Sequence, residues 1–303
     1  MKEKTDFSSI PWVKNIFESY GTNNFELVLE MLGHAEKVNL CSGNQVEAAK
    51  DHEAREKLVA CFVNTLRFGH PDNMYEVFGR TCINKEQYDK NGAFLKNFSS
   101  LFSLNYDLLI YWSMLENQLK NTFRDSFSVF GDDDKKRWFN ERYIATTNMW
   151  FLHGALHLRT DASGFSYKIV YDDVASILET LESDLNNSVY PVFVFEGTDA
   201  EKKYKINSNR YLTIANEAFE TINGTLFTYG FSFGNNDKHI RESILKSKIS
   251  NLYIGILGSE KDNDEIISIG NEIERNAYGM HADGKRAYPI TIEYYDTSAF
   301  SIW

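Results

Sequence analysis

Polar side chains that could do chemistry stand at the ends of two short apolar runs. Asn105 and Asp107 follow the run 100–104, and His153 follows the run 149–152. A short apolar run that ends in polar residues is typical of a buried parallel strand. Ligands of open α/β sheets bind outside the carboxyl ends of such strands. An amide, a carboxylate and an imidazole at one sheet edge therefore predict chemistry on a bound small molecule.

The imidazole has the most specific candidate role. Gly154 follows His153 and leaves the space beside the ring free of a side chain. Because an imidazole titrates near neutrality, His153 is a candidate general base. A structural, hydrogen-bonded histidine is the alternative. Asn105 and Asp107 equally fit a turn and a cap before a predicted helix at 108–121, and these alternatives stay open here.

A third polar segment follows a predicted strand at 225–230. Gly230 allows a ligand to approach the backbone, and Ser232 offers a hydroxyl group. The helix predicted next would present free N–H groups to a phosphate, with Asp237 as its N-cap. The structural alternative is a glycine-rich turn between a strand and a capped helix.

The same segment matches Gly-x-Ser-x-Gly, the nucleophile turn of α/β-hydrolases, and a Ser-Asp-His order could be completed by Asp262 and His281. However, that turn needs a helix directly after Ser232, whereas residues 233–236 favour a loop, so we disfavour a hydrolase triad. We expect the other histidines to lie at the surface: His34, His70, His157 and His239.

Composition limits the class of protein. The chain has 303 residues, of which 43% are hydrophobic, enough for a large core, and its net charge of −11 disfavours a nucleic-acid-binding face. It has no apolar run of 18 residues and no apolar segment near Met1, so we expect neither a membrane span nor a signal peptide. Three isolated cysteines, Cys41, Cys61 and Cys82, predict reduced core thiols in the cytoplasm and no metal site.

The pattern along the chain predicts one α/β domain over residues 1–303. Residues 1–97 read as helical, with the amphipathic stripe Phe25, Val28, Leu29 and Leu32, and residues 98–303 form the α/β core with an insertion near 122–148. Alternating strands and helices predict a Rossmann-like parallel sheet with helices on both faces. The expected strands are 100–104, 149–153, 190–196, 225–230, 251–257 and 287–294, with a hairpin across 161–164. The helices expected after the one at 108–121 are 173–186, 208–222, 238–247 and 263–276.

Taken in order, the three segments resemble sirtuin-like NAD-consuming domains. In that family an Asn-x-Asp, a His-Gly and a late Gly-x-Ser with a downstream Asp line one NAD pocket. The chain is most similar to bacterial phage-defence proteins of this type, which share Asn-Tyr-Asp-Leu-Leu followed by Tyr-Trp, here 105–112, and an early Asn-Phe-Glu, here 24–26. The resemblance covers about residues 23–250.

The resemblance implies an enzyme that hydrolyses NAD to nicotinamide and ADP-ribose in antiviral defence. Protein deacylases of the family carry a four-cysteine zinc module that this chain lacks, so no metal is implied. Asn105 would orient a water or a ribose hydroxyl, and His153 would be the general base. The implied NAD-binding residues are Asp107, Gly154, Gly230, Ser232 and Asp237.

One family feature is absent. Residues 1–22 contain no glycine-rich turn of the kind that holds the NAD phosphates. We expect either a start further upstream, a degenerate loop, or a pocket that another subunit completes, in a homo-oligomer or with a protein of the same defence system. A non-catalytic NAD or ADP-ribose sensor is the alternative function.

Overall fold

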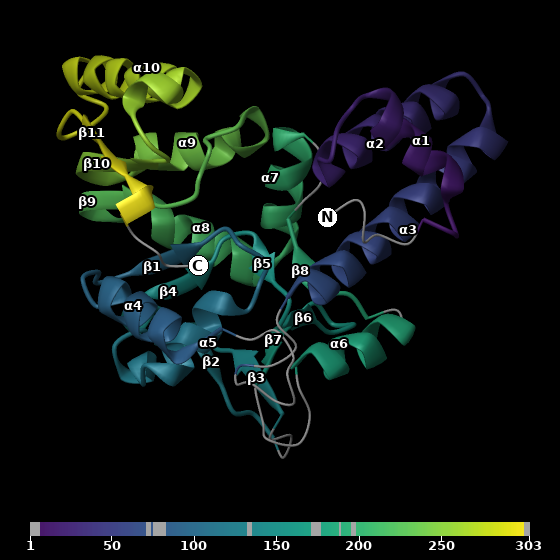
Figure 1. Cartoon of the computed structure of the whole chain (residues 1–303), viewed down its shortest axis with the longest axis horizontal. Helices are drawn as coiled ribbons and strands as arrows, with labels where there is room; N and C mark the ends of the chain where they lie inside the picture. Colours follow the sequence, from purple (N-terminus) through teal and green to yellow (C-terminus); the bar gives the residue numbers. More distant parts are fainter. Residues whose placement is uncertain are drawn as a thin grey trace.

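The structure is a computed structural model, and it describes residues 7–70, 74, 83–131, 135–170, 177–187, 189–194 and 198–299. Cys82, the start of the predicted helix 173–186 and the end of the predicted strand 190–196 lie outside the described residues. The described part is a mixed α/β structure in which several small sheets are surrounded by helices (Figure 1).

The described residues before Leu101 form helices and no strand, as the sequence predicts. The stripe Phe25, Val28, Leu29 and Leu32 is buried, because a 3.6-residue period places it on one face of its helix. Asn24 is the N-cap of that helix, and its side chain accepts hydrogen bonds from the backbone N–H groups of Glu26 and Leu27. The four helices are α1 (Pro11–Ser19), α2 (Phe25–Cys41), α3 (Gln45–Gly69) and α4 (Lys85–Leu95).

Two separate parallel sheets take the place of the single sheet that we expected. One pairs β1 (Leu101–Ser103) with β4 (Met149–Phe151). The other has the order β11-β10-β9, so β1 and β9 are both edge strands among the described residues. The strands of the second sheet are β9 (Asn223–Thr228), β10 (Lys248–Ile256) and β11 (Thr291–Asp296).

Helices of the carboxyl-terminal half cover these sheets. In Figure 1, α8 lies beside β4 and α10 lies beside β11, and both pairs are in contact. Strand β9 begins at Asn223, two residues before the predicted strand 225–230. The α-helices that follow β1 in the chain, apart from α7, are α5 (Leu109–Glu116), α6 (Ile177–Asn186), α8 (Arg210–Glu220), α9 (Lys238–Lys246) and α10 (Asp264–Ala282).

Antiparallel pairs complete the described sheets. The predicted hairpin across 161–164 is confirmed, since β6 and β7 pair antiparallel around it. The predicted parallel strand 190–196 was wrong in direction, because its described part, β8, pairs antiparallel with β5. These strands are β2 (Phe127–Ser128), β3 (Lys136–Phe139), β5 (Gly154–Ala155), β6 (Leu158–Thr160), β7 (Ser166–Ile169) and β8 (Val192–Phe193).

Helix α7 (Asp199–Ser208) was not expected from the sequence. A reciprocal capping box starts it: Thr198 Oγ1 accepts from Glu201 N, and the Glu201 carboxylate accepts from Thr198 N. The short 3₁₀ helices are η2 (Leu119–Asn121), η3 (Glu141–Thr146), η4 (Asn235–Asp237), η5 (Glu260–Asp262) and η6 (Thr297–Ala299).

The buried apolar residues form two clusters. One lies around the two parallel sheets, and the other joins α1, α2 and α3 to α5 and β8. The cysteines are less buried than we expected, because Cys41 is exposed and Cys61 is half-buried. In the part of the chain that the structure describes, no helix is both long and apolar enough to cross a membrane.

Candidate functional site

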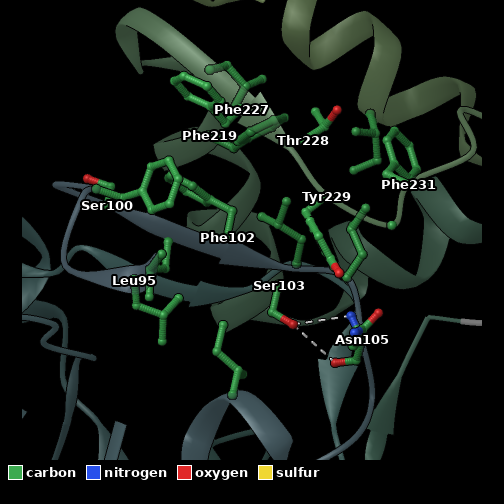
Figure 2. Close-up of a pocket in the computed structure, with 18 of the residues that line it drawn as sticks. Leu95, Ser100, Phe102, Ser103, Asn105, Phe219, Phe227, Thr228, Tyr229 and Phe231 are labelled. Atoms are coloured by element: carbon green, nitrogen blue, oxygen red, sulfur yellow. Dashed lines mark hydrogen bonds between the residues drawn. The ribbon is translucent and has the colours of Figure 1, made fainter. Parts of the chain in front are cut away.

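A cavity of about 230 Å³ separates the two parallel sheets. It lies between the facing edges of β1 and β9, and Figure 2 shows Phe102 and Ser103 on one side and Phe227 and Thr228 on the other. Aromatic and aliphatic side chains form most of its wall. The polar residues that line it include Asn91, Asn105 and Asp107.

The backbone of β1 contributes to this cavity. Leu101 donates its N–H to Asn148, and the Ser103 carbonyl accepts from Leu152, so these groups face β4. Because N–H and C=O groups alternate between the two sides of a strand, those of Phe102 point away from β4, toward the cavity. The cavity is therefore bordered by backbone polar groups as well as by aromatic rings.

Asn105 and Asp107 lie where the sequence predicts them, directly after β1, and both line the cavity. Asn105 is exposed, and its backbone N–H donates to the Ser103 hydroxyl. Asp107 Oδ1 accepts from the Leu109 N–H at 2.9 Å, but the N-cap position of α5 is occupied by Leu108 and not by Asp107. Burial raises the pKa of Asp107, although that hydrogen bond and His70 act in the opposite direction.

The loop after β9 brings Gly230 to the same cavity. Gly230 has a φ of +65°, a conformation that glycine adopts without steric cost. Phe233 has a φ of +57° although it carries a side chain, and its ring is fully buried. Such backbone strain concentrates at functional sites, because the surrounding structure must hold it in place.

His153 does not line the cavity but lies directly behind its wall. Its neighbour Leu152 lines the cavity, as does Ile240, the neighbour of His239. His153 Nε2 lies 2.9 Å from His239 Nε2, and both residues are only 3% exposed. The prediction that His239 lies at the surface was wrong, and so was the same prediction for His70 and His157, which are also buried.

Asp199 determines which ring nitrogens carry protons. Its Oδ1 accepts a hydrogen bond from the backbone N–H of His239 at 2.7 Å and lies 3.1 Å from the ring nitrogen Nδ1 of the same residue. His239 therefore carries its proton on Nδ1, which leaves Nε2 as an acceptor. His153 then donates from its own Nε2, and its Nδ1 holds a free electron pair.

The pKa values of both rings are lowered from the usual value of histidine. Burial lowers the pKa of His153 well below its usual value, and repulsion from Lys202 and from His239 in its protonated form acts in the same direction. Burial also lowers the pKa of His239, although Asp237 and Asp199 oppose this. Burial would raise the pKa of Asp199, but hydrogen bonds from Lys203 and His239 outweigh it, so the carboxylate stays ionised.

A buried lysine connects this cluster to the amino-terminal helices. Lys202 is 1% exposed, and its Nζ lies 3.0 Å from Glu26 Oε2 and 3.0 Å from Asp237 Oδ1. Asn236 donates to the same Glu26 oxygen at 3.2 Å. Lys202 thus joins α7 to α2 and to the loop before α9. Asp237 Oδ1 is also 3.9 Å from His153 Nε2.

The structure divides the predicted site residues into two adjacent groups. Asn105, Asp107 and Gly230 line the cavity, whereas His153 and Asp237 belong to the buried cluster behind it. Asp237 makes no side-chain cap, contrary to our expectation. The His239 N–H at the start of α9, which we expected to be free for a phosphate, is bound by Asp199 instead.

Gly154 and Ser232 belong to neither group. Gly154 has a φ of +82°, and a Cβ there would lie 1.8 Å from the Val192 carbonyl oxygen, so the pairing of β5 with β8 requires glycine. Ser232 is exposed on the loop after β9. The hydrolase triad is not assembled, because Asp262 accepts from Ser259 and His281 contacts the Arg286 carbonyl.

Sequence reasoning missed four residues of the cluster, and two signals could have found three of them, His239, Asp199 and Lys202. The spacing Asp237-x-His239 places two polar groups at a helix start. The Thr-x-x-Glu capping box at 198–201 predicts helix α7, and a helix puts residues three positions apart on one face. The missed residues are Glu26, Asp199, Lys202 and His239.

A family model described as "Domain of unknown function (DUF4917)" matches residues 3–303, nearly the whole chain. The chain belongs to this family. No curated protein matches it. The cavity and the buried histidine cluster are therefore features of a DUF4917 chain.

Proposed function

We propose that this DUF4917 chain is an NAD glycohydrolase. The observation that carries the proposal is the hydrogen-bonded series Asp199, His239 and His153 behind a cavity that Asn105 lines. It provides a neutral imidazole with a defined tautomer beside a pocket at the carboxyl end of a parallel strand, which is where α/β sheets bind ligands.

The cavity would accept only part of the substrate. Ligand pockets for molecules of drug size usually enclose about 300–1,000 Å³, and this cavity measures about 230 Å³. The nicotinamide ring and its ribose would enter, and the rest of NAD would lie outside. Asn91 favours such a ligand, because its buried Oδ1 has no hydrogen-bond partner in the described structure and can accept an amide N–H.

The chemistry needs only a weak base. Nicotinamide leaves as a neutral molecule when the bond between its nitrogen and ribose C1′ breaks, and the ribose becomes an oxocarbenium-like electrophile. A water oxygen then bonds to C1′ and loses one proton, and His153 Nδ1 takes that proton. Asn105 would orient the water or a ribose hydroxyl. Because burial lowers the pKa of His153, its ring is unprotonated and can accept the proton of the water.

The proposal extends to fold and biology. The two parallel sheets would be the halves of one Rossmann-like sheet, divided by the cavity, and Figure 2 supports this since β1 and β9 run in the same direction. Gly230, Ser232 and Asp237 would then stand near the phosphates or riboses. The role in antiviral defence, in a homo-oligomer or with a partner protein, follows from the sirtuin-like resemblance, and the cytoplasmic location follows from the three isolated cysteines.

One observation favours a second function, a non-catalytic sensor of NAD or ADP-ribose. His153 is nearly fully buried and does not line the cavity, so a bound ligand would need a small rearrangement to reach it. A sensor would bind the same ligand in the same cavity and leave it intact.

Incubation of the purified chain with NAD separates the two functions. The hydrolase releases nicotinamide in amounts that exceed the enzyme concentration. The sensor gives thermal stabilisation by NAD without product, because a ligand that binds only the native state raises its stability. If NAD causes neither product nor stabilisation, both functions are wrong. Retention of full activity in Asn105→Ala would contradict the assignment of this cavity.

A further inference from the structure

Three side chains of the buried cluster have the arrangement of a metal site. One ligand atom each from His153, Asp237 and His239 lies within 4.8 Å of the other two. Both histidines are 3% exposed, and Asp237 is half-buried. Two imidazole nitrogens and one carboxylate oxygen form a donor set that zinc(II) accepts, with a further position left for water.

We propose that His153, His239 and Asp237 bind one zinc(II) ion, and that this ion inhibits the hydrolysis of NAD. The inhibitory part rests on the proposed function, whereas the binding part does not. The site differs from the cysteine zinc module of deacylases in its ligands and in its place in the fold.

The distances require only a small adjustment. Two imidazole nitrogens on a tetrahedral zinc ion, each at about 2.0–2.1 Å from the metal, lie about 3.3 Å apart. The two Nε2 atoms are now 2.9 Å apart and face each other. Asp237 Oδ1, at 3.9 Å from His153 Nε2, reaches the same ion by a modest side-chain movement.

The charge of the surroundings favours a divalent cation. The ionised groups that are hydrogen-bonded to one another around the two histidines carry a formal excess of two negative charges. Lys202 stays paired with Glu26 when Asp237 turns to the metal, so its ammonium group keeps a partner. The ionised groups are the carboxylates of Glu26, Asp199, Asp237 and Glu242 and the ammonium groups of Lys202 and Lys203.

Asp199 already has the position of an outer-shell residue. Histidines that bind metals usually donate their other ring N–H to a carboxylate, which fixes the ring and its tautomer. His239 Nδ1 lies 3.1 Å from Asp199 Oδ1, so His239 is oriented with Nε2 free for the metal.

Zinc would inhibit by changing the tautomer of His153. Without metal, His153 carries its proton on Nε2 and presents the electron pair of Nδ1. When Nε2 bonds to zinc, its proton leaves and a proton is taken up at Nδ1, so the ring stays neutral but can no longer accept the proton of the attacking water. Zinc and the catalytic tautomer therefore exclude each other.

The test measures zinc binding and NAD hydrolysis separately on the full chain. Chelator-treated protein is titrated with zinc against a chromophoric chelator and with cobalt(II), whose visible absorption reports the ligand number. We expect one tight zinc per chain, no tight site in His239→Ala or Asp237→Asn, and about 10–100-fold weaker binding in Asp199→Asn. The control His34→Ala, an exposed histidine, binds as the wild type does.

The outcomes are distinct. If zinc binds equally well to His239→Ala, the binding is adventitious and the proposed site is wrong. The site is also wrong if the wild-type chain, shown to be folded by circular dichroism, does not bind zinc tightly. One equivalent of zinc should slow nicotinamide release about 100-fold or more, reversibly on chelation; undiminished release overturns the inhibition. If metal-free protein releases no nicotinamide at all, the proposed function fails, while the zinc titration still decides the site.

Discussion

The Nε2 atoms of His153 and His239 lie 2.9 Å apart, so the hydrogen bond between the two buried rings needs a proton on one of these nitrogens and an electron pair on the other. The two residues are 86 positions apart in the sequence, one after β4 and the other at the start of α9. Asp199 hydrogen-bonds to the His239 ring, so it determines through His239 which nitrogen of His153 carries the proton. Histidine chemistry at this site therefore depends on residues that need not touch a substrate.

Asp199→Asn tests that dependence. The amide can still accept a hydrogen bond from His239, but it loses the negative charge that stabilises a proton shared by the two histidines. A hydrogen bond to a charged group contributes about 1.5–3 kcal/mol, so kcat should fall at least about tenfold while KM stays near its wild-type value. Steady-state nicotinamide release measures both.

Asp264→Asn, an exposed acidic residue at the start of α10, is the matched control and should leave kcat unchanged. Equal kcat values in Asp199→Asn and wild type would show that Asp199 only caps α9.

Lys202→Ala should destabilise the fold more than other lysine substitutions. Removal of one partner from a buried ion pair costs about 3–5 kcal/mol, and the partial exposure of Glu26 and Asp237 places the expected loss at the low end, about 3 kcal/mol. Lys246→Ala removes an exposed lysine that pairs with Glu220 and should cost at most about 1 kcal/mol. Urea unfolding followed by circular dichroism compares the two, and equal losses would contradict the role of Lys202.

Glu201 should stabilise the protein in a pH-dependent manner. Burial would raise its pKa, but hydrogen bonds from Lys37 and Thr198 outweigh this and lower the pKa to about 2. Because the folded-state pKa is below the unfolded value of 4.5, the stabilisation is present above pH 4.5 and is lost as the pH falls toward about 2. The difference in unfolding free energy between wild type and Glu201→Gln should thus be larger at pH 7 than at pH 3. A difference that grows on acidification contradicts this account.

Gly154→Ala should prevent correct folding near β5. The new Cβ would lie 1.8 Å from the Val192 backbone oxygen, and the φ of +82° is unfavourable for alanine. Gly279→Ala is the control, since Gly279 is an exposed helical residue where an added Cβ would meet no neighbouring atom within 4 Å, and this change should stabilise by up to about 1 kcal/mol. Soluble yield and thermal midpoint measure both variants, and a thermal midpoint of Gly154→Ala equal to that of wild type would be the contrary result.

Local pattern predicted the positions of β1 and β4, although the strands end at Ser103 and Phe151, slightly before the predicted ends at 104 and 153. The apolar runs there are bounded by polar residues, and both strands are buried against helices, so sequence order alone brought Asn105 and Asp107 to the cavity. The amphipathic stripe of α2 was equally local. Where side-chain period and burial coincide, the sequence is sufficient.

Strand pairing and the histidine cluster could not be read in the same way. The gap between β1 and β9 depends on which edges pair, and residues 101–103 and 223–228 are too far apart for any local signal. The direction of β8 depends on backbone pairing, which the side-chain pattern does not specify. His239 is buried because α7, which we did not expect, supplies Asp199 and Lys202 next to it.

Nicotinamide release from NAD by metal-free wild type and by His153→Ala is the most direct test of the proposed hydrolase. Loss of a positioned base lowers a rate by about 10²–10⁴-fold, so we predict multiple turnovers for the wild type and for His34→Ala, and a drop of that size for His153→Ala with an unchanged circular dichroism spectrum. Equal rates in wild type and His153→Ala, or no release by the folded wild type, would contradict the account.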